Sequence, residues 1–487
     1  MIEEDEWRRA KIFKKEEDYF EFIRSIRNTL SDSTITDIFA SYLSEPRGLY
    51  ENQSRYVIKP RSTKEVSECL KLATKYKIGV VPRSGGTGLV CGQITPDKYN
   101  VTLSLERMNN IKNFSEVNQS VEVEAGVILE SIHEYVYRRN FLYPLSMASK
   151  GTCCIGGNLA TNAGGIGVLK YGNARDLCLG LEVVLADGSI INDIKTLKKD
   201  NTGYDLKNLF IGSEGSLGVI TRAVLRLYPT PQNKVVAFFG VKSFDAALKS
   251  YLELSKSFGQ YLQAFELISD VGLRFLEETK MVQSNIQRSK SGWHVLVEFG
   301  YNNSSVEQDV YEALDELCNK NIISNVVLGD TITKARKLWK IREDIPEANR
   351  KIGAITSHDI ALPLENMESF INKSLIEIKE INKFLRVNCF GHMGDGNLHF
   401  NVFPPRDEKN SSYVRIKSQL TKVINNNCKR LGGSFSAEHG VGRLKVKDLK
   451  QYCDPGKFNV MRQIKKAIDP FTILNPGVIL RQDNQDI

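Results

Sequence analysis

The sequence has no long apolar run. No stretch approaches the roughly 20 consecutive apolar residues that a helix needs to cross a bilayer, so we expect no transmembrane span. Residues 1–7 are acidic and have neither the apolar segment of a secretory signal nor the arginines of a transit peptide. These features predict a cytoplasmic protein.

Cysteine and charge patterns exclude further classes. The nine cysteines include no Cys-x-x-Cys pair, which argues against a zinc ribbon or an iron–sulfur cluster, and their odd number is typical of reduced thiols. The lysines are scattered, so the formal net charge of +8 forms no basic stripe and we expect no nucleic-acid partner. A mild positive charge favours anionic substrates instead.

Length and local patterns indicate several cores. A chain of 487 residues exceeds one ordinary core and is expected to divide into two or three domains. A strand over 55–61, a helix opening at the capping box 62–65 and a strand over 79–81 predict a β-α-β unit, and Asp187-Gly188 predicts a hairpin turn. Residues 1–44 have a charged, helical pattern, with a partial apolar face made of Phe20, Phe22, Ile23 and Ile26.

Three glycine-dense stretches stand in the first half of the chain. In the first, residues 82–92, four glycines occupy eight positions, which allows positive φ angles and lets several N–H groups converge on one anion. The stretch is not a P-loop, because no Lys followed by Ser or Thr comes after its last glycine, and its spacing is one residue too long for a dinucleotide fingerprint. A plain tight turn is the alternative for this stretch alone.

The second and third stretches, residues 151–172 and 212–221, strengthen the ligand interpretation. So much glycine costs conformational entropy on folding, and contacts between the backbone and a ligand would offset that cost. Three such stretches in one half of the chain predict an extended ligand wrapped by backbone.

A polar strand is predicted after the turn Gly394-Asp395-Gly396. Strand alternation places Asn397, His399 and Asn401 on one face, and His392 across the turn can fold back toward His399. Glu438-His439 supplies further polar chemistry, and two imidazoles with one carboxylate are a common ligand set for a divalent catalytic cation. The alternative is that each His is an ordinary core or surface residue.

In order and residue content, the three glycine stretches resemble the FAD-binding half of the vanillyl-alcohol-oxidase, or PCMH-type, flavoenzymes. With the motifs at 390–403 and 436–443, the resemblance runs from about residue 45 to about residue 480. It is strongest to the FAD-linked D-2-hydroxyacid dehydrogenases, a group that includes D-2-hydroxyglutarate dehydrogenase, D-lactate dehydrogenase and the glycolate oxidase flavoprotein subunit.

The resemblance implies an α+β fold. It places a helical preface at 1–44, a two-subdomain PCMH-type FAD-binding domain at 45–229, an antiparallel-sheet cap domain that supplies substrate groups at 230–427, and a helical C-terminal segment at 428–487 that returns to the flavin site.

The resemblance also implies FAD as the cofactor. Thr87 stands where several flavoenzymes of the wider family carry a flavin-linked His, so we expect non-covalent FAD. Glu214 would lie at the adenosine end, and the alternative for it is a surface carboxylate in a turn. The implied FAD-binding residues are Pro82, Arg83, Ser84, Gly85, Gly86, Thr87, Gly88, Gly92, Gly156, Gly157, Asn158, Thr161, Asn162, Gly164, Gly165, Tyr171, Glu214, Gly215, Ile220 and Asn475.

The same resemblance assigns the chemistry. His439 matches the catalytic base, and Arg342 matches the arginine that binds the substrate carboxylate; a helix-surface partner of a neighbouring Glu is the alternative for Arg342. The implied substrate-binding residues are Arg342, Asn397, Asn401 and His439, and the implied ligands of a divalent metal, with zinc expected, are His392, His399 and Glu438.

The expected reaction is oxidation of a D-2-hydroxy acid to the 2-oxo acid, with hydride passing to flavin N5 and then to an electron acceptor that the motifs do not identify. D-2-Hydroxyglutarate is the expected substrate, and D-lactate or glycolate is the alternative. Pro346 and Ser357 depart from the hydroxyglutarate pattern, although His358 could supply the missing charge. From other classes, the alternatives are an electron-transfer partner subunit without a substrate site and a non-flavin nucleotide-binding module. The motifs do not specify an oligomeric state.

Overall fold

The computed structural model describes residues 16–48, 50–281 and 292–481. The chain forms two compact units: unit 1 is drawn from residues 1–164, 172–230 and 438–487, and unit 2 from residues 165–171 and 231–437. The first fifteen residues of the expected helical preface lie outside the described residues. Both units combine helices with sheets whose strands pair mostly antiparallel, which confirms the α+β prediction.

The first sheet of unit 1 contains the expected β-α-β unit. Its strand order is β1-β2-β4-β3, with β4 parallel to both β2 and β3. Helix α4 links β2 to β3, and the Oγ of its cap residue Ser62 accepts the backbone N–H of Glu65 at 3.2 Å, which confirms the predicted N-cap. The Glu65 carboxylate accepts the N–H of Arg61 at 2.8 Å instead of that of Ser62. The bounds are β1 Ile35–Asp37, β2 Tyr56–Ile58, α4 Thr63–Tyr76, β3 Val80–Arg83 and β4 Val101–Ser104.

The second sheet of unit 1 is antiparallel throughout and has the order β5-β6-β10-β8-β9. Its β8–β9 hairpin turns at Asp187-Gly188, where Gly188 has a φ of 83°, as the sequence predicts. The bounds are β5 Ile111–Ser115, β6 Ser120–Glu124, α5 Leu129–Tyr137, β7 Phe141–Leu142, α6 Ile155–Ala160, β8 Cys178–Val184, β9 Ile190–Asp193, α8 Leu206–Phe210, β10 Val219–Arg226 and β11 Tyr228–Pro229.

Both described ends of the chain pack onto the first sheet of unit 1. Helix α2 (Glu16–Thr29) buries Phe22, Ile23 and Ile26 as expected, but Tyr19 is the fourth buried residue, whereas Phe20 is 45% exposed. At the other end, residues 473–475 run beside β3, since Val80 N–H donates to Ile473 O and Asn475 N–H donates to Val80 O, both at 2.8 Å. The remaining helices of unit 1 are η1 Asp32–Thr34, α3 Ala40–Leu43, α15 Val446–Tyr452 and α16 Pro455–Ile468.

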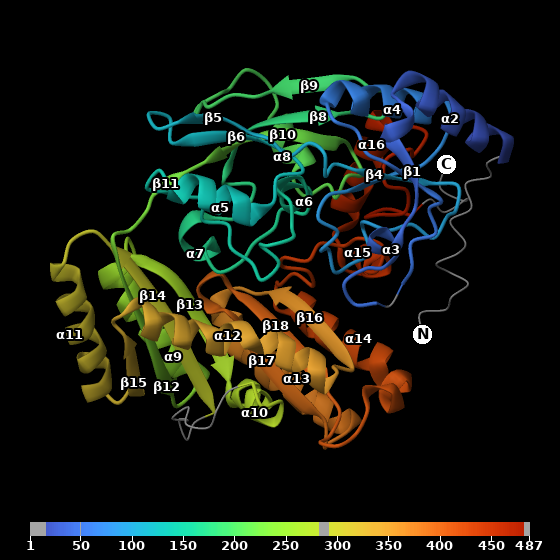
Figure 1. Cartoon of the computed structure of the whole chain (residues 1–487). Coiled ribbons are helices and arrows are strands. Elements are labelled where there is room, and N and C mark those ends of the chain that lie inside the picture. Colours follow the sequence, from blue (N-terminus) through green and yellow to red (C-terminus); the bar gives the residue numbers. More distant parts are fainter. Residues whose placement is uncertain (1–15, 49, 282–291, 482–487) are drawn as a thin grey trace. The chain divides into compact units, whose positions relative to one another are not determined.

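Unit 2 is built on a seven-stranded sheet of order β15-β12-β14-β13-β17-β18-β16 (Figure 1). All six neighbouring pairs are antiparallel, which confirms the antiparallel sheet expected for this half of the chain. The bounds are β12 Asn233–Val241, β13 Leu262–Ser269, β14 Trp293–Tyr301, β15 Ile323–Gly329, β16 Thr356–Ala361, β17 Arg386–His392 and β18 Asn397–Phe403.

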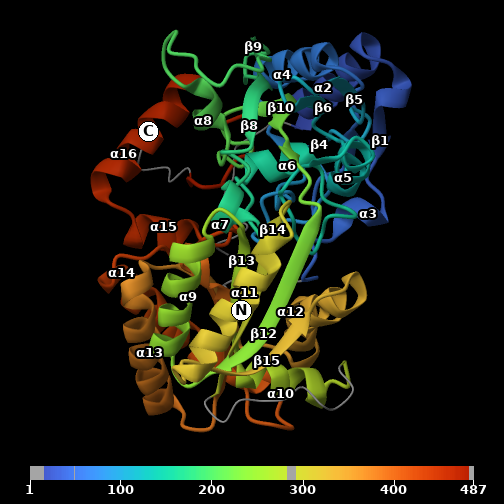
Figure 2. The ribbon, with the colours of Figure 1, turned by 90° about the vertical axis from the view of Figure 1, so that its left-hand side faces the viewer.

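Helices cover both faces of this sheet (Figures 1 and 2). Strand alternation divides the core. Phe239 belongs to the cluster on the face covered by α9 (Phe244–Phe258), α11 (Ser305–Asn319), α13 (Met367–Ile381) and α14 (Val414–Arg430). Its neighbour Phe238 packs on the opposite face with α10 (Asp270–Glu278) and α12 (Ile332–Ile352), and we call this the α12 face. The short helices of unit 2 are α7 Val168–Tyr171, η2 Leu364–Asn366, η3 Met393–Asp395 and η4 Asn410–Tyr413.

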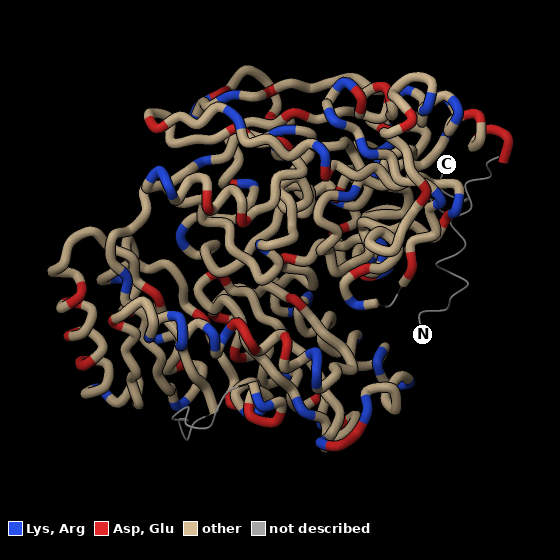
Figure 3. The backbone as a smooth tube through the Cα atoms, viewed as in Figure 1, with Lys and Arg blue, Asp and Glu red and all other residues tan. Residues whose placement is uncertain are grey.

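The distribution of charged residues and the polarity of the helices are those expected from the sequence. Lys and Arg are interspersed with Asp and Glu along the described parts of the chain (Figure 3). Within residues 16–48, 50–281 and 292–481, each helix is too short or too polar to span a lipid bilayer.

Candidate active site

The three glycine stretches contact one another in unit 1, although residues 165–171 of the second stretch belong to unit 2. A Cβ added at Gly85 would overlap the carbonyl oxygen of Thr152, so the first stretch touches the second backbone to backbone. The third stretch touches the second, because Glu214 N–H donates to Ala160 O at 2.7 Å. Side chains have no room at the first contact, which is why the sequence places glycine there.

Two side chains hold these stretches in place. The Asn475 amide nitrogen donates to Gly92 O at 2.9 Å and to Glu214 O at 2.8 Å, which joins the first stretch to the third. The Gln93 amide nitrogen donates to Gly88 O at 2.7 Å. Gln93 was not among the residues expected at the site, although its place at the end of the first stretch was the available signal.

The first stretch presents unpaired backbone donors. The amides of residues 84–92 donate no hydrogen bond to another described residue. Gly86 and Cys91 adopt positive φ angles of 69° and 60°, which turn successive N–H groups out of a regular ladder. A row of unpaired amides in a glycine loop fits the phosphate groups of a dinucleotide cofactor such as FAD.

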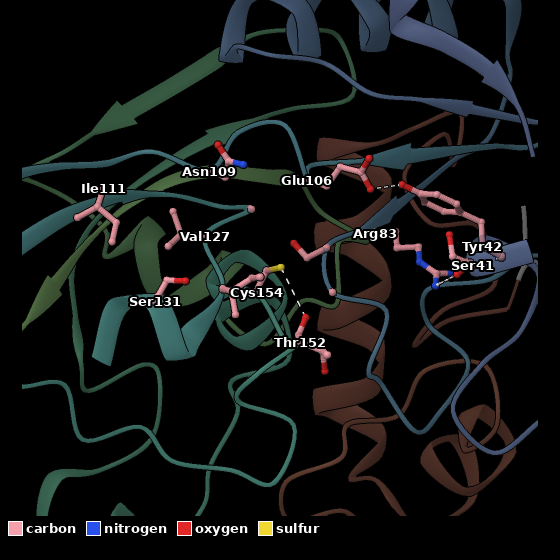
Figure 4. A pocket seen from close by; sticks show the side chains of 14 residues that line it. Ser41, Tyr42, Arg83, Glu106, Asn109, Ile111, Val127, Ser131, Thr152 and Cys154 are labelled. Carbon is pink, nitrogen blue, oxygen red and sulfur yellow. Dashed lines mark hydrogen bonds between the residues drawn. The ribbon is translucent and has the colours of Figure 1, made fainter. Parts of the chain in front are cut away.

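A cavity of about 400 Å³ opens beside this loop in unit 1 (Figure 4). This volume lies in the usual range for small-molecule sites. Its lining includes Arg83, Ser84 and Gly85 from the first stretch and Thr152 and Cys154 from the second, and it is completed by Ser41, Tyr42, Glu106, Asn109, Ile111, Gly126, Val127, Ile128 and Ser131.

The Arg83 side chain is used to hold the wall of that cavity. Its guanidinium donates to Ser41 O at 2.7 Å and Tyr42 O at 3.2 Å and lies 4.9 Å from the centre of the Tyr42 ring (Figure 4). Burial lowers the pKa of Arg83. These two hydrogen bonds direct the guanidinium toward residues 41 and 42 of the cavity wall.

The other expected cofactor residues divide between the units. Tyr171 belongs to unit 2, where its hydroxyl donates to Gln263 Oε1 at 2.9 Å, and Gly165 belongs to the same unit. Asn162 has a φ of 49°, and its Oδ1 accepts the N–H of Arg175 at 3.0 Å. The remaining expected cofactor residues lie in unit 1: Pro82, Thr87, Gly156, Gly157, Asn158, Thr161, Gly164, Gly215 and Ile220.

Glu214 is a buried carboxylate, so the alternative of a surface turn is wrong. Its two oxygens accept the backbone N–H groups of Val441 and Gly442, each at 2.7 Å. Burial raises the pKa of Glu214 to about 7, although these two hydrogen bonds favour the charged form. A Cβ on Gly440 would lie 2.7 Å from Glu214 Oε1, so this contact requires a glycine there.

The segment that follows Glu438 and His439 is anchored a second time by Arg443. The buried Arg443 guanidinium donates to Ile94 O at 2.7 Å and to Asn475 Oδ1 at 3.0 Å, and also to Pro476 O. Arg443 and Glu214 together fix the backbone directly after the expected metal ligand and the expected base.

In unit 2, the polar strand is β18, and its alternation is as predicted. Leu398, Phe400 and Val402 are fully buried in the core on one face. The expected residues Asn397, His399 and Asn401 therefore project to the α12 face, with Asn401 only 7% exposed.

The two histidines of this face lie close together. Their ring centres are 5.9 Å apart, which confirms that His392 folds back toward His399. The Nδ1 of His392 lies 2.5 Å from Glu266 Oε1, and the Nδ1 of His399 lies 3.8 Å from Asp359 Oδ1. Each imidazole therefore has a carboxylate on its Nδ1 side, which is how ligating histidines are commonly oriented.

Asp359 also contacts the expected substrate residue Asn397. The Asn397 amide nitrogen donates to Asp359 Oδ1 and to Ile360 O, both at 2.9 Å. Its Oδ1 is buried and has no partner among the described residues. A buried acceptor without a partner is costly, and it fits a site that takes a hydroxyl or another hydrogen-bond donor.

Arg342 projects from α12 onto the same face. It is 6% exposed, its Nε donates to Glu266 Oε2 at 2.6 Å, and its guanidinium carbon lies 4.7 Å from the centre of the Phe390 ring. The alternative of a helix-surface arginine paired with a neighbouring Glu is therefore wrong. Burial would raise the pKa of Glu266, but the charges of His392 and Arg342 outweigh it and lower that pKa to about 2.

His358 does not supply the charge that Ser357 lacks. Successive strand residues face opposite ways, and the His358 ring forms a hydrogen bond of 2.7 Å with Thr356 Oγ1 on the face away from Asp359. Ser357 and Pro346 are both exposed, and Pro346 lies inside α12.

Glu266 and Asp359 were missed by the sequence analysis. Each is a single buried acidic residue inside a strand; Leu262–Ser269 is buried throughout and Thr356–Ala361 is mostly buried. A carboxylate in such a strand must be paired or hydrogen-bonded, and that was the available signal. The structure thus gathers Arg342, the two histidines and their carboxylates in unit 2, while Glu438 and His439 belong to unit 1.

Models of known protein families match both halves of the chain. Residues 54–193 match the model of an FAD binding domain, and residues 230–479 match the model of the C-terminal domain of FAD linked oxidases. The chain belongs to the FAD-linked oxidase family and is an oxidoreductase with an FAD-binding domain.

Individual relatives cover most of the chain. A mitochondrial D-2-hydroxyglutarate dehydrogenase of Bos taurus is 36% identical over 429 residues, which are 88% of this chain and 77% of the relative. A mitochondrial protein of Schizosaccharomyces pombe, named provisionally as a D-lactate dehydrogenase, is 36% identical over 437 residues, 88% of this chain and 82% of the relative.

The fold recurs in p-cresol methylhydroxylase. That structure matches with a TM-score of 0.76 at 16% identity, over 98% of this chain and 99% of the other, which shows a shared fold. The names of the bovine and yeast relatives contradict the cytoplasmic prediction, because both are mitochondrial proteins. That prediction rested on the lack of a leader pattern. Localisation depends on signals that import receptors recognise, and the fold does not determine them.

Proposed function

We propose that this chain is an FAD-dependent dehydrogenase that oxidises a D-2-hydroxy acid to the 2-oxo acid, with D-2-hydroxyglutarate as its main substrate. The observation that carries the proposal is the α12 face of unit 2, where a buried arginine lies beside two carboxylate-oriented histidines. An arginine fork suits a carboxylate, and paired imidazoles suit a cation that binds hydroxy-acid oxygens.

FAD is bound without a covalent link, since Thr87 stands at the position of a linking His in the wider family. The amides of residues 84–92 bind its pyrophosphate, and the second and third glycine stretches enclose the rest of the cofactor. When bound, FAD supplies a hydride acceptor. The chain holds the cofactor through backbone contacts, and its glycines leave room for the cofactor because they carry no side chain.

The substrate is held by side chains of the second half of the chain. Arg342 binds the carboxylate of the hydroxy acid. Asn397 offers its buried Oδ1 as a hydrogen-bond acceptor, because both of its amide N–H groups already donate to Asp359 and Ile360. Asn401 completes the substrate-binding residues. His392, His399 and Glu438 hold a divalent cation, with zinc favoured by the nitrogen and oxygen ligand set, and a cation there lowers the pKa of the substrate hydroxyl. His439 accepts the hydroxyl proton.

D-Lactate is the second candidate. Ser357 and Pro346 offer no cation for a distal carboxylate, and the relative from Schizosaccharomyces pombe carries a provisional D-lactate dehydrogenase name. A smaller substrate without a second carboxylate would need no such cation.

Steady-state kinetics with an artificial electron acceptor test the proposal. The panel contains both enantiomers of 2-hydroxyglutarate and lactate, together with glycolate. We expect the highest kcat/KM for D-2-hydroxyglutarate, whereas a higher value for D-lactate would favour the second candidate. Turnover of L-acids alone would contradict the proposed stereochemistry.

Anaerobic mixing separates the enzyme from a partner subunit. An enzyme with its own substrate site reduces its own flavin when D-2-hydroxyglutarate is added, which bleaches the yellow absorbance. A partner subunit without a substrate site would keep its flavin oxidised with every acid of the panel.

A further inference from the structure

Glu266 connects two groups to which the proposed function gives different tasks. It lies on β13, is fully buried, and uses one oxygen for each partner: Oε1 lies 2.5 Å from His392 Nδ1 and Oε2 lies 2.6 Å from Arg342 Nε. The partners are 126 and 76 positions away along the chain. A single carboxylate therefore fixes the position of both.

The contact to His392 selects a tautomer. An ionised carboxylate only accepts hydrogen bonds, so the His392 Nδ1 beside it must carry the hydrogen. In that tautomer the other ring nitrogen, Nε2, carries the lone pair that a cation ligand needs. Because Glu266 and His392 are also register partners on the neighbouring strands β13 and β17, the backbone ladder fixes this geometry.

The contact to Arg342 aims its guanidinium. Glu266 occupies Nε, and the Phe390 ring lies under the guanidinium plane at 4.7 Å. The two terminal nitrogens, Nη1 and Nη2, form the edge that remains for a bidentate contact to a carboxylate. The Arg342 guanidinium is always charged, so its 2.6 Å contact with Glu266 is an ion pair.

We propose that Glu266 is a positioning residue that couples cation binding to recognition of the substrate carboxylate, by orienting His392 for the cation and Arg342 for the substrate at the same time. The inference rests on the proposed function of His392 as a cation ligand and Arg342 as the carboxylate clamp. It adds a residue between them that touches neither cation nor substrate.

The test compares Glu266→Gln with Glu298→Gln in the holoenzyme. Glu298 is a matched control on the same face of the sheet, because its carboxylate also joins two side chains, one of them on α12. Its oxygens lie 2.8 Å from Lys234 Nζ and 2.7 Å from Trp339 Nε1. The readouts are the Zn²⁺ dissociation constant by competition with a chelator, the FAD-to-protein ratio, and KM and kcat measured separately.

For Glu266→Gln we expect Zn²⁺ affinity to fall by about 10- to 100-fold, the loss typical when the carboxylate partner of a ligating His is removed. We also expect KM for the hydroxy acid to rise, with the FAD-to-protein ratio unchanged. Glu298→Gln should keep the parental Zn²⁺ affinity and KM. Parental values of both quantities in folded Glu266→Gln would overturn the proposal.

Two further variants keep the outcome decisive. If Glu266→Gln does not fold, Glu266→Asp replaces it, because Asp keeps the charge but is too short to bridge both partners, and it should lose affinity in the same direction. His392→Ala tests the underlying function: if it keeps the parental Zn²⁺ affinity, the proposed cation site fails. If His392→Ala loses Zn²⁺ while folded Glu266→Gln and Glu266→Asp both keep it, only the role of Glu266 fails.

Discussion

Glu214 and Gly442 lie 228 positions apart and are joined by a hydrogen bond of 2.7 Å from the backbone N–H of Gly442 to Glu214 Oε2. The other carboxylate oxygen accepts the N–H of Val441. The third glycine stretch therefore holds the segment that begins with Glu438 and His439, so a residue expected to contact the cofactor also determines where the expected base is anchored.

Glu214→Gln is predicted to change the pH dependence of stability. The folded-state pKa of about 7 lies above the ordinary value of 4.5, so the folded state binds the proton more tightly than the unfolded state. The resulting stabilisation is complete below the ordinary pKa and is lost as pH rises through the folded-state pKa. The shift corresponds to roughly 3 kcal/mol between these limits.

The measurement is the melting temperature of both proteins with saturating FAD, from about pH 5 to about pH 8. Gln does not titrate, so the melting temperature of the variant minus that of the parent should increase as pH rises. The lost N–H acceptor shifts this difference by a similar amount at every pH. A difference that stays constant or decreases with pH would contradict the buried, proton-binding state of Glu214.

Gly85→Ala should disrupt the contact between the first and second glycine stretches. The added Cβ would overlap the Thr152 carbonyl, which is backbone and cannot rotate away. We expect a lower melting temperature and a lower FAD-to-protein ratio after purification. Gly151→Ala is the control, because its Cβ would meet only the flexible Glu130 side chain at 3.2 Å, and it should behave like the parent.

Gly92→Ala separates cofactor contact from protein packing. The atom nearest to an added Cβ is Glu214 Oε2 at 3.6 Å, an ordinary contact distance, so the protein without cofactor should keep its melting temperature. If FAD passes close to Gly92 as expected, the FAD dissociation constant should rise while that stability is unchanged. Unchanged FAD affinity would remove Gly92 from the cofactor path.

Features encoded in short segments were predictable from the sequence. The buried face of β18 follows from a period of two residues, and the Ser62 cap follows from a four-residue motif. Glycine stretches are equally local signals, because the demand for positive φ or a close backbone approach falls on the glycine itself. The family resemblance then assigned a part of the cofactor to each glycine stretch.

Contacts between distant segments were not predictable in this way. Glu266 reaches Arg342 only because β13 lies under α12, and it reaches His392 only because β13 pairs with β17. Neither the strand order nor the pairing register is encoded in the local pattern around Glu266. The same holds for His358, because the face to which its side chain projects depends on the pairing register of β16 in the sheet.

His439→Ala is predicted to abolish most of the substrate-driven flavin reduction. Loss of a positioned general base typically lowers the rate by about 10²- to 10⁴-fold. FAD content should be unchanged, and the rate of flavin reduction by D-2-hydroxyglutarate is followed under anaerobic conditions. His358→Asn is the control, since its ring bonds to Thr356 on the face away from Asp359, and it should reduce its flavin at close to the parental rate.

Removal of divalent metal by a chelator should separate cofactor binding from substrate oxidation. The unpaired amides of residues 84–92 and the glycine contacts belong to unit 1 and involve no metal ligand, so the protein should keep its FAD and its yellow absorbance. The histidine pair in unit 2 would lose its cation, and the substrate hydroxyl would then keep its high pKa and react slowly. Adding Zn²⁺ should restore turnover, whereas full turnover in metal-depleted protein would show that Arg342 and His439 suffice without a cation.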